Sequence, residues 1–121
     1  MMEDLQDFIA RSLTEYAEDV KQIVNEAEKN VGEGAVKELK KTSPKQTGNY
    51  KKGWTKKIQN KGRGIKKVIV YNKNEPHLTY LLEHGHAKRN GGRVAAKVHI
   101  DPAAAKAAEE FEKTVREELS R

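Results

Sequence analysis

The chain has 121 residues, of which 36% are hydrophobic and 35% are charged, and its formal net charge is +6. This length predicts a single domain over residues 1–121, with a modest core that favours stabilisation by other copies or by a partner. The absence of cysteine excludes disulfides and Cys-based zinc sites, while the acidic start and the lack of an apolar run of about 18 residues predict neither a signal peptide nor a membrane span.

Charge is strongly segregated along the chain. Residues 1–36 carry a net charge of −6, residues 37–73 carry +12, and residues 74–121 are neutral overall. A basic middle third is typical of a phosphate-binding face. It is equally typical of a solvated hairpin, or of a surface that meets the acidic N-terminal segment of a neighbouring copy. All three interpretations remain open at this point.

The first predicted element is a long helix over residues 1–41. Its apolar residues recur every three or four positions and form one stripe: Leu5, Phe8, Ile9, Leu13, Tyr16, Val20, Ile23, Val24, Ala27, Val31, Val36 and Leu39. A continuous helix of this length spans roughly 50 Å, which is more than the rest of a small domain can cover. The excess favours contact with another subunit. Gly32 and Gly34 are the expected points for a kink or an end, since each costs about 1 kcal/mol relative to alanine.

Residues 42–101 are predicted to hold a small antiparallel sheet and a short helix. Pro44 stops the long helix, and Gly48 and Gly53 mark a turn. Residues 54–72 then predict two strands around a Gly-Arg-Gly turn. We expect Trp54 and Ile58 to pack on the long helix, although a basic hairpin with one Trp also fits a nucleic-acid-binding ribbon.

The segment that follows predicts a short helix with Leu78, Leu81 and Leu82 facing inward and with Gly85 as its C-cap. Residues 86–93 form a loop, and residues 94–100 form a third strand. Asp101 is the predicted N-cap and Pro102 the first residue of a C-terminal helix over residues 102–121. The predicted fold class is therefore α+β.

The sequence EHGH suggests a metal-binding or catalytic site, because three of the four histidines lie between residues 84 and 99. A zinc site from Glu83, His84, His86 and His99 can be drawn, but its spacing fits no established zinc signature. A metal-dependent nuclease of the HNH type requires a ββα unit, whereas the order here is helix, loop, strand, helix. We therefore predict no catalytic, cofactor-binding or metal-binding residues and no enzyme activity.

Four phrases of the sequence together resemble one protein family. They comprise Ser43, Pro44, Thr47, Gly48, Tyr50 and Trp54; Tyr71 and Asn72; Tyr80, Leu82, Glu83 and Gly85; and His99, Pro102 and Ala103. In this order and spacing, over residues 43–121, they resemble the small tail-component and neck proteins of long-tailed bacteriophages, the head–tail connector or minor structural family. One departure is Lys97-Val98, where the family often has proline.

The resemblance implies a structural protein of a phage or prophage virion, located at the head–tail junction or in the tail and present in the host cytoplasm during assembly. It implies a homo-oligomeric ring, portal-side or tail proteins as neighbours, no cofactor and no membrane. We expect partner contacts at six basic residues: Lys51, Lys52, Arg63, Lys88, Arg89 and Arg93. The loop from His86 to Arg93 is expected to be mobile until neighbours order it. The alternatives are a nucleic-acid-binding protein that uses residues 37–73, which leaves non-specific contact with DNA open, and a metal-dependent nuclease.

Overall fold

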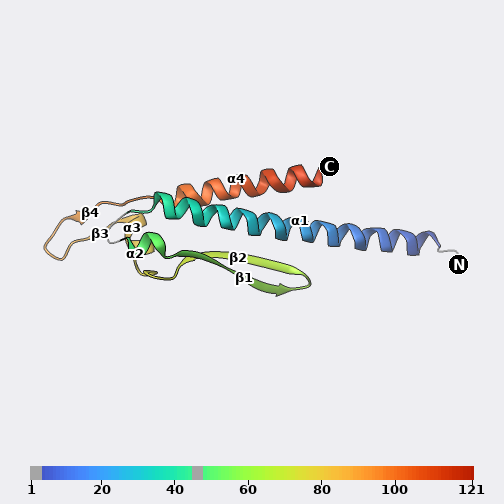
Figure 1. The fold of residues 1–121 in the computed structure, drawn as a ribbon, viewed down its shortest axis with the longest axis horizontal. Helices are drawn as coiled ribbons and strands as arrows, with labels where there is room; N and C mark the ends of the chain where they lie inside the picture. The colour runs from blue at the N-terminus through green and yellow to red at the C-terminus, as the bar shows by residue number, and fades with distance from the viewer. Residues whose placement is uncertain (1–3, 45–47) are drawn as a thin grey trace.

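The computed structural model describes residues 4–44 and 48–121 and has the predicted α+β architecture. Thr47, one of the motif residues, lies outside the described residues. The elements in chain order are α1 (Leu5–Thr42), α2 (Asn49–Lys52), β1 (Trp54–Gly62), β2 (Ile65–Asn72), α3 (Leu78–His84), β3 (His86–Ala87), β4 (Arg93–Val94) and α4 (Ile100–Leu119). Helix α1 runs almost the full length of the molecule, with α4 along one side and the β1–β2 hairpin along another (Figure 1).

Helix α1 is continuous over 38 residues, so the expected kink or end at Gly32 and Gly34 is wrong. It begins after Asp4, whose carboxylate accepts a hydrogen bond from Asp7 N at 2.8 Å. The reason for glycine at position 32 is packing, because a Cβ there would lie 2.6 Å from Cγ1 of Val68 in β2. Gly32 lowers the helix propensity of α1, but its lack of a side chain allows the hairpin to approach α1 closely.

The predicted hairpin forms around the Gly-Arg-Gly turn, and its register runs from the Trp54–Asn72 pair to the Gly62–Ile65 pair, with a bulge between Asn60 and Gly62. The outer edge of β2 is hydrogen-bonded to side chains of α1. Asn25 Nδ2 donates to Gly64 O at 2.6 Å, Lys66 N donates to Asn25 Oδ1 at 3.2 Å, and Val68 N donates to Glu28 Oε1 at 2.6 Å. These bonds cover a strand edge that would otherwise be free to pair with another strand.

The predicted third strand over residues 94–100 is wrong. Only Val94 of that segment is in a strand: β4 pairs with β3 in a separate two-residue hairpin, His86 with Val94 and Ala87 with Arg93. Residues 95–99 instead pass the end of α3, where Lys97 N donates to Leu82 O at 2.7 Å. The segment cannot extend the main sheet at β2, because α1 already occupies that edge.

Helix α4 begins at Ile100 with His99 as its N-cap, so the predicted N-cap at Asp101 and start at Pro102 are wrong. It runs antiparallel to α1 and packs beside it (Figure 1). The core lies at the closed end of this arrangement, and its buried residues are Leu39, Tyr50, Trp54, Leu82 and Ala103. Val36, Val70, Leu78 and Ile100 pack against them.

The other end of the molecule is a single unpacked helix. Residues 4–19 of α1 are all exposed and extend beyond both α4 and the hairpin (Figure 1). Across residues 4–44 and 48–121, no helix has both the length and the apolar character that crossing a membrane requires.

Candidate functional site

Six of the motif residues meet in one buried junction, although they come from four separate parts of the chain. It joins the end of α1, helix α2, the start of β1, the end of β2, the end of α3 and the start of α4. We define the junction by six buried residues: Ser43, Tyr50, Trp54, Asn72, Glu83 and His99. These six motif residues therefore belong to the interior of the fold, whereas Tyr71, Tyr80 and Pro102 of the same phrases are exposed.

Trp54 ties the hairpin to the end of α1. Its Nε1 donates to Ser43 Oγ at 2.7 Å, and Ser43 Oγ in turn donates to Leu39 O. The indole is 4% exposed and packs in the core with Leu39, as predicted. Ile58, which was expected beside it on the helix, is 50% exposed.

Tyr50 and His99 form a buried pair, with Tyr50 Oη 2.6 Å from His99 Nε2. His99 Nδ1 lies 2.7 Å from Lys97 O, and since a carbonyl only accepts, Nδ1 carries the proton. The same Nδ1 lies 3.3 Å from Glu83 Oε1, while the Tyr50 hydroxyl engages the other ring nitrogen, Nε2. Burial, together with the charge of Glu83, raises the pKa of Tyr50 to about 12, which keeps the phenol protonated.

Glu83 caps helix α4 from a different element. Its Oε1 accepts from His99 N and Ile100 N, each at 2.8 Å, and its Oε2 accepts from Asp101 N at 2.8 Å. Pro102 comes next and has no N–H, so every donor of the first turn is satisfied. Burial by itself raises the pKa of Glu83, but the three backbone hydrogen bonds and nearby His99 outweigh it and lower the pKa.

Asn72 and Gly53 close the junction at the end of the hairpin. Asn72 Nδ2 donates to Tyr50 O at 2.7 Å, and Asn72 Oδ1 accepts from Asn74 N at 3.2 Å and Glu75 N at 2.9 Å. A Cβ at Gly53 would collide with Asn72 Oδ1. The side chain of Asn72 thus fixes α2 against the turn that follows β2. Its strand neighbour Tyr71 is 38% exposed.

Gly85 is the C-cap of α3, as predicted, with φ of 74°. A Cβ at this position would lie 2.5 Å from Val94 O and 2.9 Å from Ala96 N, so only glycine fits between α3 and the returning chain. Tyr80, another motif residue, lies on the outer side of α3, is 69% exposed and packs on the ring of His84.

The junction contains a serine, a histidine and a carboxylate, but not in a catalytic arrangement. Ser43 Oγ donates to Leu39 O and accepts from Trp54, while His99 Nε2 is engaged by Tyr50. A serine nucleophile needs its hydroxyl hydrogen-bonded to the histidine base. Within the described part of the chain, no group of three or more His, Asp or Glu side chains is placed to hold a metal ion, so the zinc site drawn from Glu83, His84, His86 and His99 does not form.

The six basic residues predicted to contact partners do not form one patch. Lys88 and Arg89 lie in the β3–β4 loop, which projects from the core end of the molecule (Figure 1), and Arg93 begins β4, where its guanidinium donates to His84 O at 3.4 Å. Lys51 and Lys52 lie on α2, where Lys51 Nζ donates to Lys41 O at 3.2 Å. Arg63 lies in the β1–β2 turn, at the far end of the hairpin from α2.

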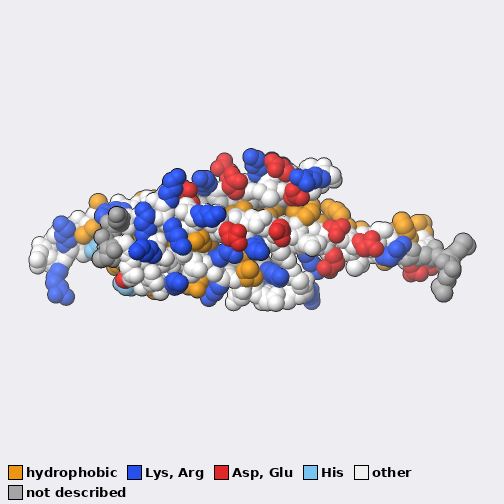
Figure 2. Space-filling model, viewed as in Figure 1, with side chains coloured by type: hydrophobic (Ala, Val, Ile, Leu, Met, Phe, Trp, Pro, Cys, Tyr) orange, Lys and Arg blue, Asp and Glu red, His pale blue; other side chains and the backbone are white. Residues whose placement is uncertain are grey.

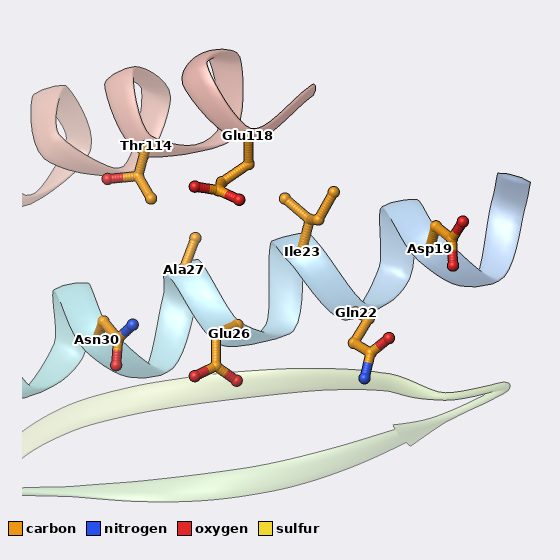
Figure 3. A pocket seen from close by; sticks show the side chains of 8 residues that line it. All are labelled: Asp19, Gln22, Ile23, Glu26, Ala27, Asn30, Thr114 and Glu118. Atoms are coloured by element: carbon orange, nitrogen blue, oxygen red, sulfur yellow. The ribbon is translucent and has the colours of Figure 1, made fainter. Parts of the chain in front are cut away.

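Sequence reasoning missed an acidic groove between α1 and α4. It has a volume of about 610 Å³ and is lined by Asp19, Gln22, Ile23, Glu26, Ala27, Asn30, Thr114 and Glu118. Thr114 and Glu118 point from α4 toward Ile23 and Ala27 on α1 (Figure 3). The excess of acids in residues 1–36 was a signal for it, but the placement of Glu118 depends on how α4 packs, which the sequence pattern does not reveal.

An elongated α+β body with a sealed polar interior, an exposed helix end and a projecting basic loop favours a structural or binding subunit. Comparison with known families identifies the family to which this subunit belongs. Residues 6–85 match the family described as "Bacteriophage HK97-gp10, putative tail-component". The match covers more than half of the chain, so the chain belongs to this family of phage tail components. A search of the curated proteins gave no match, and neither did a search of the solved structures.

The family match confirms the tail-component resemblance but differs from it in extent. It includes most of α1 and ends at Gly85, whereas the resemblance was drawn over residues 43–121. The fourth phrase, with His99, Pro102 and Ala103, therefore lies outside the matched region. Its connection to the other three is structural, through the bonds between Glu83 and the start of α4.

Proposed function

We propose that this chain is a non-enzymatic subunit of the head–tail connector, the neck or the tail-completion assembly of a phage or prophage virion. In this role it is a homo-oligomer, arranged as a ring, between portal-side and tail proteins, and it is assembled in the host bacterial cytoplasm. The observation that supports this more specific role is the projecting β3–β4 hairpin. It presents three cations at one end of an elongated subunit.

The loop is built for contact outside its own chain. Its turn is closed by Lys88 N donating to Gly92 O at 2.9 Å and Gly91 N donating to Lys88 O at 3.3 Å. A Cβ added at Gly91 or Gly92 would meet nothing within 4 Å among the described atoms, so the tip packs on no other element there. Residues that bury little alone gain their contacts on assembly, at an ordering cost of about 1–2 kcal/mol per residue.

Acidic surfaces are the partners that suit this loop. Either residues 1–36 of a neighbouring copy or another virion protein offers the carboxylates that pair with Lys88, Arg89 and Arg93. Figure 2 shows Lys and Arg side chains gathered over the core end of the molecule, while acidic and hydrophobic side chains dominate the projecting end of α1. Ends of opposite charge favour ordered association between neighbouring copies. They determine the relative orientation of the copies more than the affinity between them.

The test replaces Lys88, Arg89 and Arg93 together by Ser in a phage or prophage that depends on this chain. We expect nearly unchanged thermal melting of the purified protein, because the three side chains are exposed and the bond from Arg93 to His84 O is long, at 3.4 Å, but a block in particle completion that leaves separate heads and tails. Electron microscopy of lysates and plaque counts measure this. The control replaces Lys113, Arg116 and Arg121 of the C-terminal region by Ser, which removes the same charge and only surface ion pairs.

The control variant should complete its particles. Normal infectious particles from the loop variant would contradict the assembly role of the loop. A loop variant that unfolds would also contradict it, because the three cations would then be needed for the fold itself.

A nucleic-acid-binding function is the second candidate, and one feature of the hairpin favours it. Residues 54–72 carry six Lys or Arg and no acid. Lys57 lies over the ring of Tyr71 at 5.4 Å on the solvent side, whereas Lys56 is paired with Glu33 at 3.3 Å. Titration of a DNA duplex at several salt concentrations tests nucleic-acid binding. A steep fall in affinity with rising salt supports this function, and no binding at low salt excludes it.

A further inference from the structure

The tip of the β3–β4 hairpin contains a chemically labile pair of residues, Asn90 and Gly91. The chain has seven asparagines, and only Asn90 is followed by glycine. An asparagine is thermolabile because the backbone nitrogen of the next residue can attack its side-chain carbonyl carbon. Glycine hinders this attack least, since it has no Cβ.

The structure leaves the attack unhindered at Asn90. Both Asn90 and Gly91 are exposed at the tip of the projecting hairpin (Figure 1). Gly91 has φ of 93°, and a Cβ added there would meet nothing within 4 Å among the described atoms. The attacking atom, Gly91 N, donates to Lys88 O at 3.3 Å, which is longer than the usual distance of about 2.9–3.0 Å. The backbone nitrogen is therefore only weakly restrained.

The other asparagines are restrained by hydrogen bonds or by regular secondary structure. The side-chain amides of Asn25, Asn72 and Asn74 donate to backbone carbonyls at 2.6, 2.7 and 2.9 Å. Asn60 is exposed like Asn90, but it lies in β1 and is followed by a lysine. Asn60 is therefore an internal control for the effect of exposure alone.

The charges of the hairpin favour the same reaction. Lys88, Arg89 and Arg93 all lie within three residues of Asn90, and residues 86–93 contain no acid. Positive charge stabilises the deprotonated backbone nitrogen that attacks and the oxyanion that forms on the side-chain carbonyl.

We propose that Asn90 is a site of spontaneous deamidation. A base in the solvent removes the proton of Gly91 N, and this nitrogen forms a bond to Asn90 Cγ. The bond from Cγ to Nδ2 then breaks, and ammonia leaves with a proton taken from water. Water opens the resulting cyclic imide at either of its carbonyls and gives an aspartyl or an isoaspartyl residue. Water is the only co-reactant, and no atom is oxidised or reduced.

Deamidation changes the surface to which the proposed function assigns partner binding, and this part of the inference rests on that function. The formal charge of residues 86–93 falls from +3 to +2, because one carboxylate joins three cations. An isoaspartyl residue also lengthens the main chain within a turn that Lys88 N closes by donating to Gly92 O at 2.9 Å. Both changes weaken binding to an acidic partner.

Mass spectrometry of the purified protein, incubated from neutral to alkaline pH, tests the site. The peptide with Asn90 should gain the mass that replaces an amide NH₂ by a hydroxyl, at least about tenfold faster than the peptide with Asn60. The rate should rise with pH, since the attacking nitrogen must lose its proton. Asn90→Gln should remove the change, because its longer side chain would have to close a larger ring. Equal rates at Asn90 and Asn60, or a rate independent of pH, would overturn the assignment.

Particle completion tests the consequence. Purified chain is added to a lysate of a phage that depends on this chain but lacks its gene, and infectious particles are counted. Incubated wild type should complete about fivefold fewer particles than equally incubated Asn90→Gln, which corresponds to the loss of one exposed ion pair. The Asn90→Gln protein controls for every other change during incubation.

Equal completion by these two proteins would overturn the consequence and leave the virion role intact. If freshly purified wild type restores no particles, the virion role fails and the consequence fails with it. The deamidation site is decided separately, by the mass spectra alone.

Discussion

Glu83 lies at the end of α3 but determines where α4 begins. The local sequence Asp101-Pro102 is a good helix start, and sequence reasoning placed the N-cap there. The structure begins the helix earlier, because one buried carboxylate binds the backbone N–H groups of His99, Ile100 and Asp101. A contact across 16 to 18 positions thus overrides a local signal, and no pattern within the helix reveals it.

Replacing Glu83 by Gln should destabilise the fold. The amide has one acceptor oxygen in place of two, and its NH₂ group would face backbone donors, so we expect a loss of about 1–3 kcal/mol in the free energy of unfolding. Urea unfolding measures it. Glu83→Asp, which keeps the charge on a shorter side chain, should be less damaging if charge dominates the cap, and an unchanged Glu83→Gln variant would contradict the capping role.

The same carboxylate makes stability depend on pH in a defined direction. The folded-state pKa of Glu83 lies below its ordinary value of 4.5, since the backbone hydrogen bonds outweigh burial. The contribution of Glu83 to the free energy of unfolding is therefore complete above its ordinary pKa. This contribution is lost as the pH falls through the lowered folded-state pKa. The gap in stability between wild type and Glu83→Gln should narrow over this acid range, and a gap that stays constant would contradict an ionised Glu83.

At the element scale, the local patterns were sufficient where an element is defined by its own residues. The stripe of α1, the β1–β2 hairpin and α3 with Gly85 were all predicted from periodicity and turn residues. The misjudged positions depend on distant contacts. Gly32 was taken for a break because its contact with Val68 is invisible in the sequence, and the third strand failed because Lys97 bonds the end of α3 instead of a strand.

The hairpin depends on one anchor, so Trp54→Ala should destabilise the protein by about 3–5 kcal/mol through the cavity it leaves in the core. Trp54→Phe should lose less stability. It removes the hydrogen bond to Ser43 Oγ but keeps an aromatic ring in the core. Ile58→Ala on the same strand is the control and should cost little, since Ile58 is half-exposed. Thermal melting followed by circular dichroism ranks the three, and a Trp54→Ala protein that melts with wild type would show that the core does not need the indole.

For the whole molecule, the charge separation along the sequence becomes a separation in space only in part, because Glu28 and Glu33 of the acidic first third contact the basic hairpin. The acidic, apolar end of α1 projects from one end, while the basic loop and hairpin belong to the body (Figure 2). The sequence predicted that α1 was too long for its own domain. It could not predict the groove between α1 and α4, because that groove depends on how α4 packs against α1.

Removing residues 1–18 should therefore leave a folded body. Residues 4–18 are all exposed, so their loss removes no core contact, and the melting temperature should stay close to that of wild type. Thermal melting followed by circular dichroism measures this. A truncated protein that unfolds would show that the projecting helix stabilises its own chain.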